Sequence, residues 1–228
     1  MVKQTVMSAI IIAIDGPAAS GKSTIARLLA EQHGWTYINT GQMYRAVAYF
    51  GLLSNISLPE DEFAAIGIAK SLSFSIEPNT LLVNGEDLSK KLCLPLVEKV
   101  VSAYSAIPEI RNILVRTQRD VAKKRSVVMD GRDVGTVVFP KATLKIFLVA
   151  SADVRAKRRL QDLQTRFSDN LPSYEEILRN LELRDSQDSE RSVSPLIKAP
   201  DAILIDTSTL SIEETLDQIE ELLKRGIL

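Results

Sequence analysis

The residues with the clearest chemical meaning form a glycine-bounded loop near the start of the chain. Gly16, Gly21, Lys22 and Ser23 have the spacing G-x-x-x-x-G-K-S, and an apolar run, residues 9–14, comes directly before them. A helical pattern begins just after the loop, so strand, glycine-rich loop and helix follow in the order of a P-loop. Backbone N–H groups of such a loop, together with the helix N-terminus, bind the phosphates of a nucleotide.

Each residue type in this loop has an expected part in nucleotide binding. The two glycines allow backbone conformations that a side chain would block. Lys22 would reach the phosphates, and the Ser23 hydroxyl would bind Mg²⁺. The predicted donor-binding set is Gly16, Pro17, Ala18, Ala19, Ser20, Gly21, Lys22, Ser23 and Thr24.

Composition limits the classes of protein that this chain can represent. Its 228 residues suffice for one α/β domain with a small insertion, and 45% of them are apolar. The net charge of −1 gives no overall electrostatic footprint for nucleic acid. No apolar run is long enough to span a membrane, and the run that ends in the P-loop is expected to be a core strand, not a signal peptide. Cys93 is the only cysteine, which fits a reducing compartment, so we expect a cytoplasmic monomer without membrane or nucleic-acid partners.

The elements that must position the loop alternate along the chain. Short apolar strands are expected at 35–38, 126–129, 144–149 and 202–205, and helical patterns separate them at 43–53, 61–70, 92–104, from 108 onward and at 211–225. The predicted fold class is therefore α/β, a P-loop NTPase-type three-layer fold with a five-stranded parallel sheet. His33 is expected to end the first helix.

A change of period interrupts this alternation between residues 72 and 88. Apolar residues alternate there, and Asn84-Gly85 is a strong hairpin-turn signal. Edge strands of the main sheet are the alternative, but no crossover helix separates these segments. We therefore expect a small antiparallel β insertion. The expected division is a core of residues 9–58, 108–151 and 192–228, an insertion of about 59–107 and a helical lid of about 152–191.

In parallel sheets, ligands lie beyond the carboxyl ends of the strands. That rule selects five places, of which most carry polar residues: the P-loop, Asn39-Thr40-Gly41, Asp130 to Asp133, the segment after Val149, and Asp206-Thr207. We expect these places to surround one crevice.

An arginine-rich helix is predicted directly after the strand at 144–149. Arg155, Arg158, Arg159 and Arg166 recur at helical spacings. A solvated charged face is one interpretation, and a lid that faces phosphates is the other. The position of the helix at the edge of the predicted triphosphate site favours the lid.

A second charged pattern follows at Arg184, Asp188 and Arg191, which share one helical face. These residues can form an internal ion-pair ladder. They can equally clamp a phosphate while the aspartate accepts hydrogen bonds from a hydroxyl. Spacing alone does not decide between the two.

A P-loop by itself does not distinguish a kinase from a switch GTPase, a motor or a transporter subunit. No Asn-Lys-x-Asp segment of the GTPase type is present, and arginines concentrate beyond the P-loop. Phosphoryl transfer depends on positioning and charge, which arginines of a mobile lid supply. These features favour a small-molecule kinase. Another nucleoside monophosphate kinase, a shikimate-type kinase and a non-catalytic nucleotide-binding module are the alternatives.

Four segments together resemble the bacterial-type cytidylate (CMP) kinases, over about residues 10–222. They are Gly16 to Thr24, Thr40 to Arg45, Asp130 to Pro140, and Arg184-Asp185-x-x-Asp188-x-x-Arg191 with Pro195-Leu196. The P-loop is widely shared, whereas the third and fourth segments are narrow to this family. The resemblance implies ATP-dependent phosphorylation of CMP or dCMP with Mg²⁺, and an inserted small β-sheet near the monophosphate.

The resemblance also implies roles for individual residues. The CMP-binding set is Thr40, Arg45, Ser102, Arg111, Arg132, Asp133, Arg184, Asp188 and Arg191. Among these, Arg45, Arg132 and Arg184 would contact the acceptor phosphate. Ser102, Arg111 and Asp133 would read the cytosine, and Asp188 and Arg191 would bind the ribose. The catalytic set is Lys22, Arg132, Arg158, Arg159 and Arg184. The predicted metal set is Ser23 of the P-loop and Asp130, which lies at the end of a strand and is our candidate for orienting the water shell of Mg²⁺.

Two positions depart from the family pattern. Asn39 stands where the family usually has Asp, and Gln42 where Ala is common. We expect the loss of a carboxylate at position 39 to alter acceptor binding or the way the turn is fixed. Neither change removes a predicted phosphate ligand.

Overall fold

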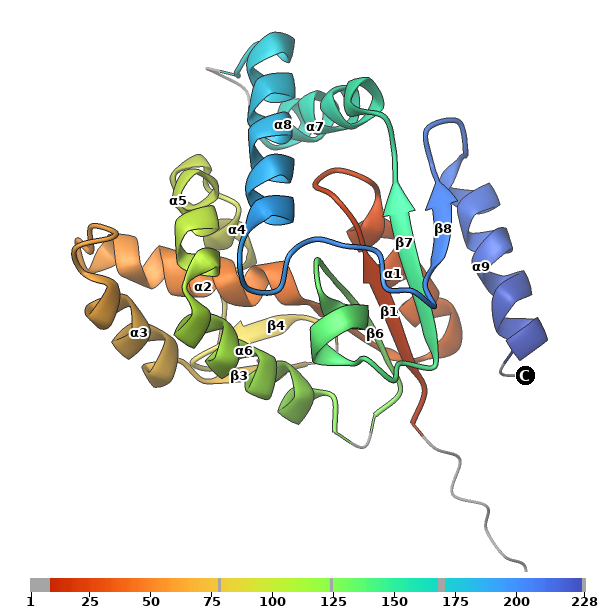
Figure 1. Ribbon diagram of the computed structural model, residues 1–228, viewed down its shortest axis with the longest axis horizontal. Coiled ribbons are helices and arrows are strands. Elements are labelled where there is room, and N and C mark those ends of the chain that lie inside the picture. Colours follow the sequence, from red (N-terminus) through yellow and green to blue (C-terminus); the bar gives the residue numbers. More distant parts are fainter. Residues whose placement is uncertain (1–8, 78, 124, 168–170, 227–228) are drawn as a thin grey trace, which may run out of the picture.

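A five-stranded parallel sheet lies at the centre of the fold (Figure 1). The computed structural model describes residues 9–77, 79–123, 125–167 and 171–226. The strand order is β2-β6-β1-β7-β8, and every neighbouring pair is parallel. The bounds are β1 Ile11–Asp15, β2 Thr36–Asn39, β6 Val127–Gly131, β7 Leu144–Val149 and β8 Ile203–Asp206. The predicted parallel sheet is confirmed.

Helices cover both faces of this sheet because the central strands are apolar on both sides. Ile12 and Ile14 pack in a core with α1 (Lys22–His33) and α9 (Ile212–Gly226). Ala13 points to the opposite face, into a core with α2 (Thr40–Leu53) and α6 (Pro108–Val121). Successive residues of a strand face opposite sides, so two buried cores follow from one continuous apolar run. The three-layer architecture is confirmed.

The predicted antiparallel insertion is also present. It consists of β3 (Phe74–Ile76), β4 (Leu81–Val83) and β5 (Glu86–Asp87), in that order. Asn84 and Gly85 both have positive φ, 52° and 81°, as a two-residue hairpin turn requires. The helices α3 (Glu62–Ser71), α4 (Ser89–Leu92) and α5 (Pro95–Ala106) flank this small sheet.

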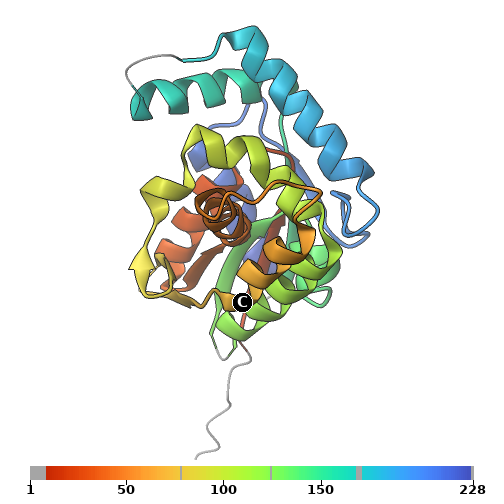
Figure 2. The ribbon, with the colours of Figure 1, turned by 90° about the vertical axis from the view of Figure 1, so that its left-hand side faces the viewer.

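Two helices extend beyond the carboxyl edge of the parallel sheet, as Figures 1 and 2 show. We call α7 (Ala152–Arg166) and α8 (Tyr174–Glu190) the lid helices. A small apolar core joins them to each other and to the P-loop; its buried members are Ala18, Ala156, Leu163, Ile177 and Leu181. Ser173 and Glu176 form a capping box at the start of α8.

The structure differs from the sequence-based expectation at three places. Helix α2 begins at Thr40, not Met43, because the Asn39 side chain accepts a hydrogen bond from the Gln42 N–H at 3.2 Å and caps the helix. The apolar stripe at 92–104 is split, and Pro95 begins a separate helix. Residues Val134–Val138 form a π-helical turn, η1, which the sequence does not predict.

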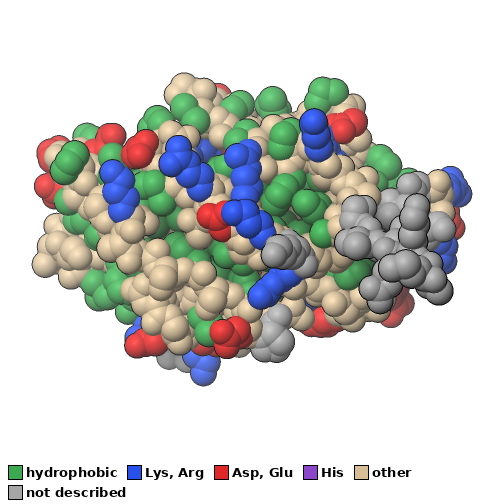
Figure 3. Space-filling view, turned by 90° about the horizontal axis from the view of Figure 1, so that it is seen from below, with side chains coloured by type: hydrophobic (Ala, Val, Ile, Leu, Met, Phe, Trp, Pro, Cys, Tyr) green, Lys and Arg blue, Asp and Glu red, His purple; other side chains and the backbone are tan. Residues whose placement is uncertain are grey.

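The surface at the amino ends of the strands mixes basic, acidic and apolar side chains (Figure 3). Within the described ranges, no helix has the length and apolar character needed to cross a bilayer. The single histidine, His33, ends α1 as predicted, where its Nε2 lies 2.7 Å from Glu220 and its ring stacks on Trp35.

Candidate active site

One cavity of about 990 Å³ lies at the carboxyl ends of β1, β2 and β6, beside the lid helices. Its lining includes P-loop residues 18–24, residues 39–42, residues 130–133, and side chains of α7 and α8. Segments that are far apart in the sequence therefore meet in one place, as the rule for parallel sheets predicts. Gly16 and Pro17 of the predicted donor set lie outside the lining, whereas the other seven residues of that set belong to it.

The P-loop has the backbone that its glycines permit. Gly16 has φ 147°, and a Cβ at this position would lie 2.0 Å from the carbonyl oxygen of Leu148. Gly21 has φ 94° and directly precedes α1, so the loop and the helix N-terminus meet at one point. A side chain at position 16 cannot be accommodated unless β7 moves.

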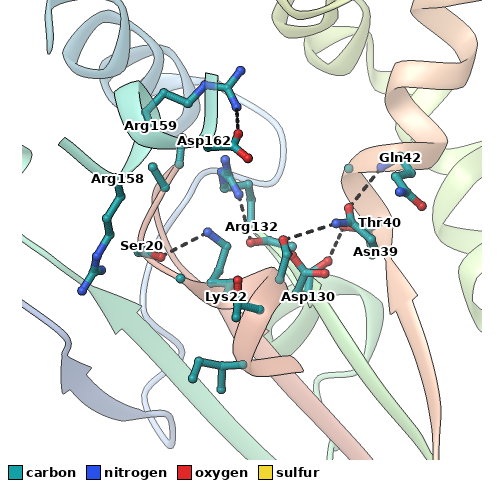
Figure 4. A pocket seen from close by; sticks show the side chains of 18 of the residues that line it. Ser20, Lys22, Asn39, Thr40, Gln42, Asp130, Arg132, Arg158, Arg159 and Asp162 are labelled. Atoms are coloured by element: carbon teal, nitrogen blue, oxygen red, sulfur yellow. Dashed lines mark hydrogen bonds and ion pairs between the residues drawn. The ribbon is translucent and has the colours of Figure 1, made fainter. Parts of the chain in front are cut away.

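Lys22 lies within this loop and is 5% exposed. Its Nζ donates hydrogen bonds to the carbonyl of Pro17 and, at 3.3 Å, to Ser20 Oγ (Figure 4). Burial lowers the pKa of Lys22 well below its usual value, and the nearby Arg132 guanidinium lowers it further. An anion bound beside this ammonium group would oppose both effects.

A cluster of oxygen-bearing side chains lies next to Lys22. Ser23 Oγ donates to Asp130 Oδ2 at 2.8 Å, and the Tyr37 hydroxyl donates to Asp130 Oδ1 at 2.9 Å. The Asn39 amide donates to both hydroxyls, at 3.3 Å to Ser23 and 3.1 Å to Tyr37. Burial raises the pKa of Asp130, an effect that the charge of Lys22 opposes.

Sequence reasoning selected Ser23 and Asp130 for this cluster but missed Tyr37. The sequence does contain a signal for Tyr37. In a strand, alternate residues face the same side, so the side chain of Tyr37 lies on the same side of β2 as that of Asn39. The Asn39 oxygen caps α2 and its amide group contacts the cluster. At position 39, where the family usually has Asp, the side-chain amide of Asn39 therefore fixes the turn between β2 and α2.

Three further arginines line the cavity, and one of them, Arg132, lies near Lys22. Arg45, Arg132 and Arg184 all belong to the lining, and buried Nε atoms of Arg45 and Arg184 have no hydrogen-bond partner in the described structure. Burial, with the charges of Arg132 and Arg45, lowers the pKa of Arg184 to about 10. Like charges brought together in this way form a site for an anion.

A buried ion pair forms a further part of the wall. Arg111 Nη2 lies 2.5 Å from Asp133 Oδ2, and the two residues are 2% and 4% exposed. The Arg111 guanidinium lies 5.1 Å from the centre of the Tyr44 ring, and its Nη1 donates to the Ser105 carbonyl at 3.0 Å. The predicted Ser102 is not among the lining residues, whereas Val101 and Ser105 of the same helix are.

Asp188 lies at the centre of an ion-pair network. Its Oδ2 accepts from Arg132 Nε at 2.8 Å, and its Oδ1 lies 3.5 Å from Arg191 Nη1. Its backbone carbonyl accepts from the Leu196 N–H at 2.7 Å. Of the predicted ladder, the Asp188–Arg191 pair is present, whereas no ion pair joins Arg184 to Asp188 among the described residues. Through Arg132, the network connects α8 to the segment at the end of β6.

The lid arginines do not share one orientation, which corrects the expectation of a single phosphate-facing row. Arg155 is 6% exposed and does not line the cavity; it binds the carbonyls of Ala18 and Ala150 and pairs with Asp185 at 2.6 Å. The reason is that Arg155 lies on the side of α7 that packs against the P-loop and α8.

The other three arginines of α7 line the cavity. Figure 4 shows that Arg158 and Arg159 point in different directions. Arg158 donates to the hydroxyl and carbonyl oxygens of Thr207, at 2.9 and 2.6 Å. Arg159 pairs with Asp162 at 2.8 Å and also with Glu98 of α5. Arg166 pairs with Asp162 at 2.8 Å. Sequence reasoning missed Glu98, although it is the only acidic residue in α5.

The P-loop, the parallel sheet and a second, arginine-lined site on the same cavity define a P-loop kinase that acts on a small anionic acceptor. The family model "Cytidylate kinase" matches residues 12–225. This chain belongs to the cytidylate kinase family, and it is a nucleoside monophosphate kinase.

Individual relatives agree with this assignment. A cytidylate kinase of Clostridium botulinum (strain Langeland) is 46% identical over 214 residues, which cover 94% of this chain and 97% of the relative. One from Caldanaerobacter subterraneus is 46% identical over 94% of this chain and 95% of its own. A crystal structure of an uncharacterized protein from Eubacterium ventriosum shares the fold alone, with a TM-score of 0.52, 14% identity, and coverage of 94% and 98%.

Proposed function

We propose that this chain transfers the γ-phosphoryl group of ATP to a phosphate oxygen of CMP or dCMP, forming ADP and CDP or dCDP. The observation that carries this proposal is the buried Arg111–Asp133 pair on the wall of the cavity that also holds Lys22. Charge alone would fit any monophosphate, whereas a paired guanidinium and carboxylate can read a base.

The donor phosphates would bind at the P-loop. Lys22 and the backbone N–H groups before α1 face an anion there, and phosphate oxygens would replace Pro17 and Ser20 as partners of the ammonium group. Ser23 and Asp130 fit Mg²⁺ because they bring a hydroxyl and a carboxylate oxygen within 2.8 Å of each other. The metal would neutralise charge on the donor phosphates.

The acceptor phosphate would bind at Arg45, Arg132 and Arg184. Its oxygen is already anionic at pH 7, so the attack on phosphorus needs no strong general base. Positioning and charge neutralisation then supply the catalysis, with Arg158 and Arg159 on the lid side. The network of Asp188 and Arg191 would bind the pentose, and closure of residues 152–191 would exclude water.

The base would be read by Arg111 and Asp133. A guanidinium can donate to O2 and N3 of cytosine, and a carboxylate can accept from its exocyclic amine. UMP has a carbonyl in place of that amine and would place two acceptors against each other. We expect a discrimination of about 1–3 kcal/mol, or roughly ten- to hundredfold.

The test is steady-state kinetics with CMP, dCMP, UMP, AMP and dTMP as acceptors. CMP and dCMP should have the highest kcat/KM, with UMP lower by about ten- to hundredfold. An equal or higher kcat/KM for UMP or AMP would contradict the base assignment.

Lys22→Ala separates transfer from acceptor binding in the same experiment. Turnover should be lost, whereas CMP affinity, measured by calorimetry, should stay close to that of the unaltered protein, since Lys22 lies on the donor side. Retained turnover in the variant would exclude Lys22 from the donor site.

A further inference from the structure

Glu98 of α5 connects the two phosphate-binding groups of the cavity. Its Oε1 lies 3.6 Å from Arg45 Nη2 of α2, and its Oε2 pairs closely with Arg159 Nη2 of α7. One carboxylate therefore contacts an arginine on the acceptor side and another on the lid side. All three residues line the cavity.

The charges around Glu98 make it a counter-ion for this site. Among other acidic residues of the lining, Asp133 is paired with Arg111, and Asp188 with Arg132 and Arg191. Asp162 shares Arg159 with Glu98 and also pairs with Arg166. The charge of Glu98 also acts on Arg184, where it raises a pKa that burial lowers. Glu98 thus places one negative charge between guanidinium groups that are able to bind phosphates.

We propose that Glu98 is a positioning residue that holds Arg159 away from the transferring phosphoryl group until an acceptor phosphate takes Arg45. This inference rests on the proposed function, because it uses the roles given there to Arg45 and Arg159. A phosphate dianion carries more charge than Glu98 and can, like a carboxylate, accept two parallel hydrogen bonds from a guanidinium. A dianion bound at Arg45 repels the Glu98 carboxylate and attracts Arg159, which is then held only by its second partner, Asp162.

The ion pairs of Glu98 with Arg45 and Arg159 are weak enough for a bound acceptor phosphate to displace them. The side chains of Glu98, Arg45 and Arg159 are 24%, 20% and 21% exposed. Partly exposed ion pairs are weak compared with buried ones, so an incoming ligand can exchange with them. A ligand shifts such an equilibrium by its differential affinity for the two states.

This arrangement would suppress the hydrolysis of ATP by water while no CMP is bound. In the productive reaction, a CMP oxygen bonds to the γ-phosphorus as the bond to the β–γ bridging oxygen breaks, giving ADP and CDP. When water attacks in its place, the same bond breaks and the products are ADP, inorganic phosphate and a proton. Holding Arg159 on Glu98 withholds charge stabilisation from the second reaction while no acceptor is bound.

Glu98→Gln tests this inference because it keeps the shape of the side chain and removes its charge. ATP hydrolysis without CMP, followed by phosphate release, should rise about fivefold, the factor that corresponds to roughly 1 kcal/mol for one such pair. KM for CMP should fall by a similar factor, since Arg45 no longer has a competing partner. If Glu98 had a purely structural role, the variant would show neither faster ATP hydrolysis nor a lower KM for CMP.

Glu109→Gln is the matched control, because this exposed residue in the first turn of α6 carries the same charge. The E109Q variant should change neither the rate of ATP hydrolysis without CMP nor the KM for CMP. If E98Q does not fold, Glu98→Asp, which keeps the charge and shortens the reach, should show smaller changes in the same directions. Unchanged hydrolysis and unchanged or higher KM in the folded variant would overturn the inference.

Arg45→Met separates the two proposals. It should raise KM for CMP if Arg45 binds the acceptor phosphate. If KM rises in R45M but E98Q behaves as E109Q does, the inference about Glu98 fails and the proposed function stands. If R45M leaves KM unchanged, the acceptor assignment fails, and the role of Glu98 fails with it.

Discussion

At the scale of single residues, Asp15 shows how the sheet supports the site above it. Its Oδ1 accepts from the Val134 N–H at 2.8 Å and its Oδ2 from the Gly135 N–H at 2.7 Å. These bonds hold the start of η1, directly after the site residues Arg132 and Asp133. Burial nevertheless raises the pKa of Asp15 to about 6, against the two hydrogen bonds that favour its charged form.

A pH-dependent contribution to stability follows from Asp15. The unfolded chain releases this proton near pH 3.8, whereas the folded protein keeps it until about pH 6. The folded state therefore binds more protons in this window, and the free energy of unfolding falls as pH rises. Once the pH is above about 6, Asp15 has lowered the free energy of unfolding by about 3 kcal/mol relative to its value below pH 3.8.

Asp15→Asn removes the titration and isolates the effect. The difference in unfolding free energy, variant minus unaltered protein, should rise between pH 4 and pH 6 and then level off. Urea titrations across pH 4–7 measure it, and any constant cost of the amide cancels in the trend. A difference that stays flat over this range would show that Asp15 is ionised throughout.

At the scale of elements, Arg155 fixes the base of α7. Its guanidinium joins the P-loop carbonyl of Ala18, the carbonyl of Ala150 and the carboxylate of Asp185 on α8. The lid helices thus depend on one buried cation in addition to their small apolar core. Arg155 therefore connects both lid helices directly to the P-loop segment.

Arg155→Met keeps an aliphatic side chain of similar length but removes these contacts. Because it leaves Asp185 without its partner, we expect the lid helices to open more easily, by about 1–3 kcal/mol. Hydrogen exchange should then quicken in α7 and α8 and stay unchanged in β1 and β6.

Asp185→Asn is the milder companion, since the amide oxygen can still accept from Arg155. It should quicken exchange in the same helices by less than Arg155→Met does. Equal protection of α7 and α8 in R155M and the unaltered protein would mean that the apolar core alone holds the lid helices.

The sequence predicts the elements of this protein better than the directions of its side chains. The five strands and the P-loop follow from apolar runs and glycine spacing, which are local properties. The turn η1 has no local signal, because its stability depends on Asp15, more than a hundred positions earlier. Helical spacing grouped Arg155 with Arg158, but packing against the P-loop gave Arg155 a structural partner.

At the scale of the whole molecule, the donor and acceptor groups line one cavity. Lys22 of the P-loop and Arg111 at the proposed base site both belong to it. The parallel sheet positions the first, and the helices beside the insertion position the second. A single cavity is what direct transfer between two nucleotides requires, since the reacting oxygens must meet without water between them.

A single compound that carries both nucleosides tests this arrangement. Adenosine and cytidine joined by a chain of phosphates should compete with both ATP and CMP. Because its second half binds at high effective concentration, its affinity should exceed that of either nucleotide by about a hundredfold or more. The analogue with two adenosines should bind less tightly, by roughly 1–3 kcal/mol, since adenine lacks the cytosine pattern that Arg111 and Asp133 fit. Inhibition constants against each substrate measure both effects. Competition with ATP alone would place the acceptor outside this cavity, and equal affinity for the two analogues would remove base reading from Arg111 and Asp133.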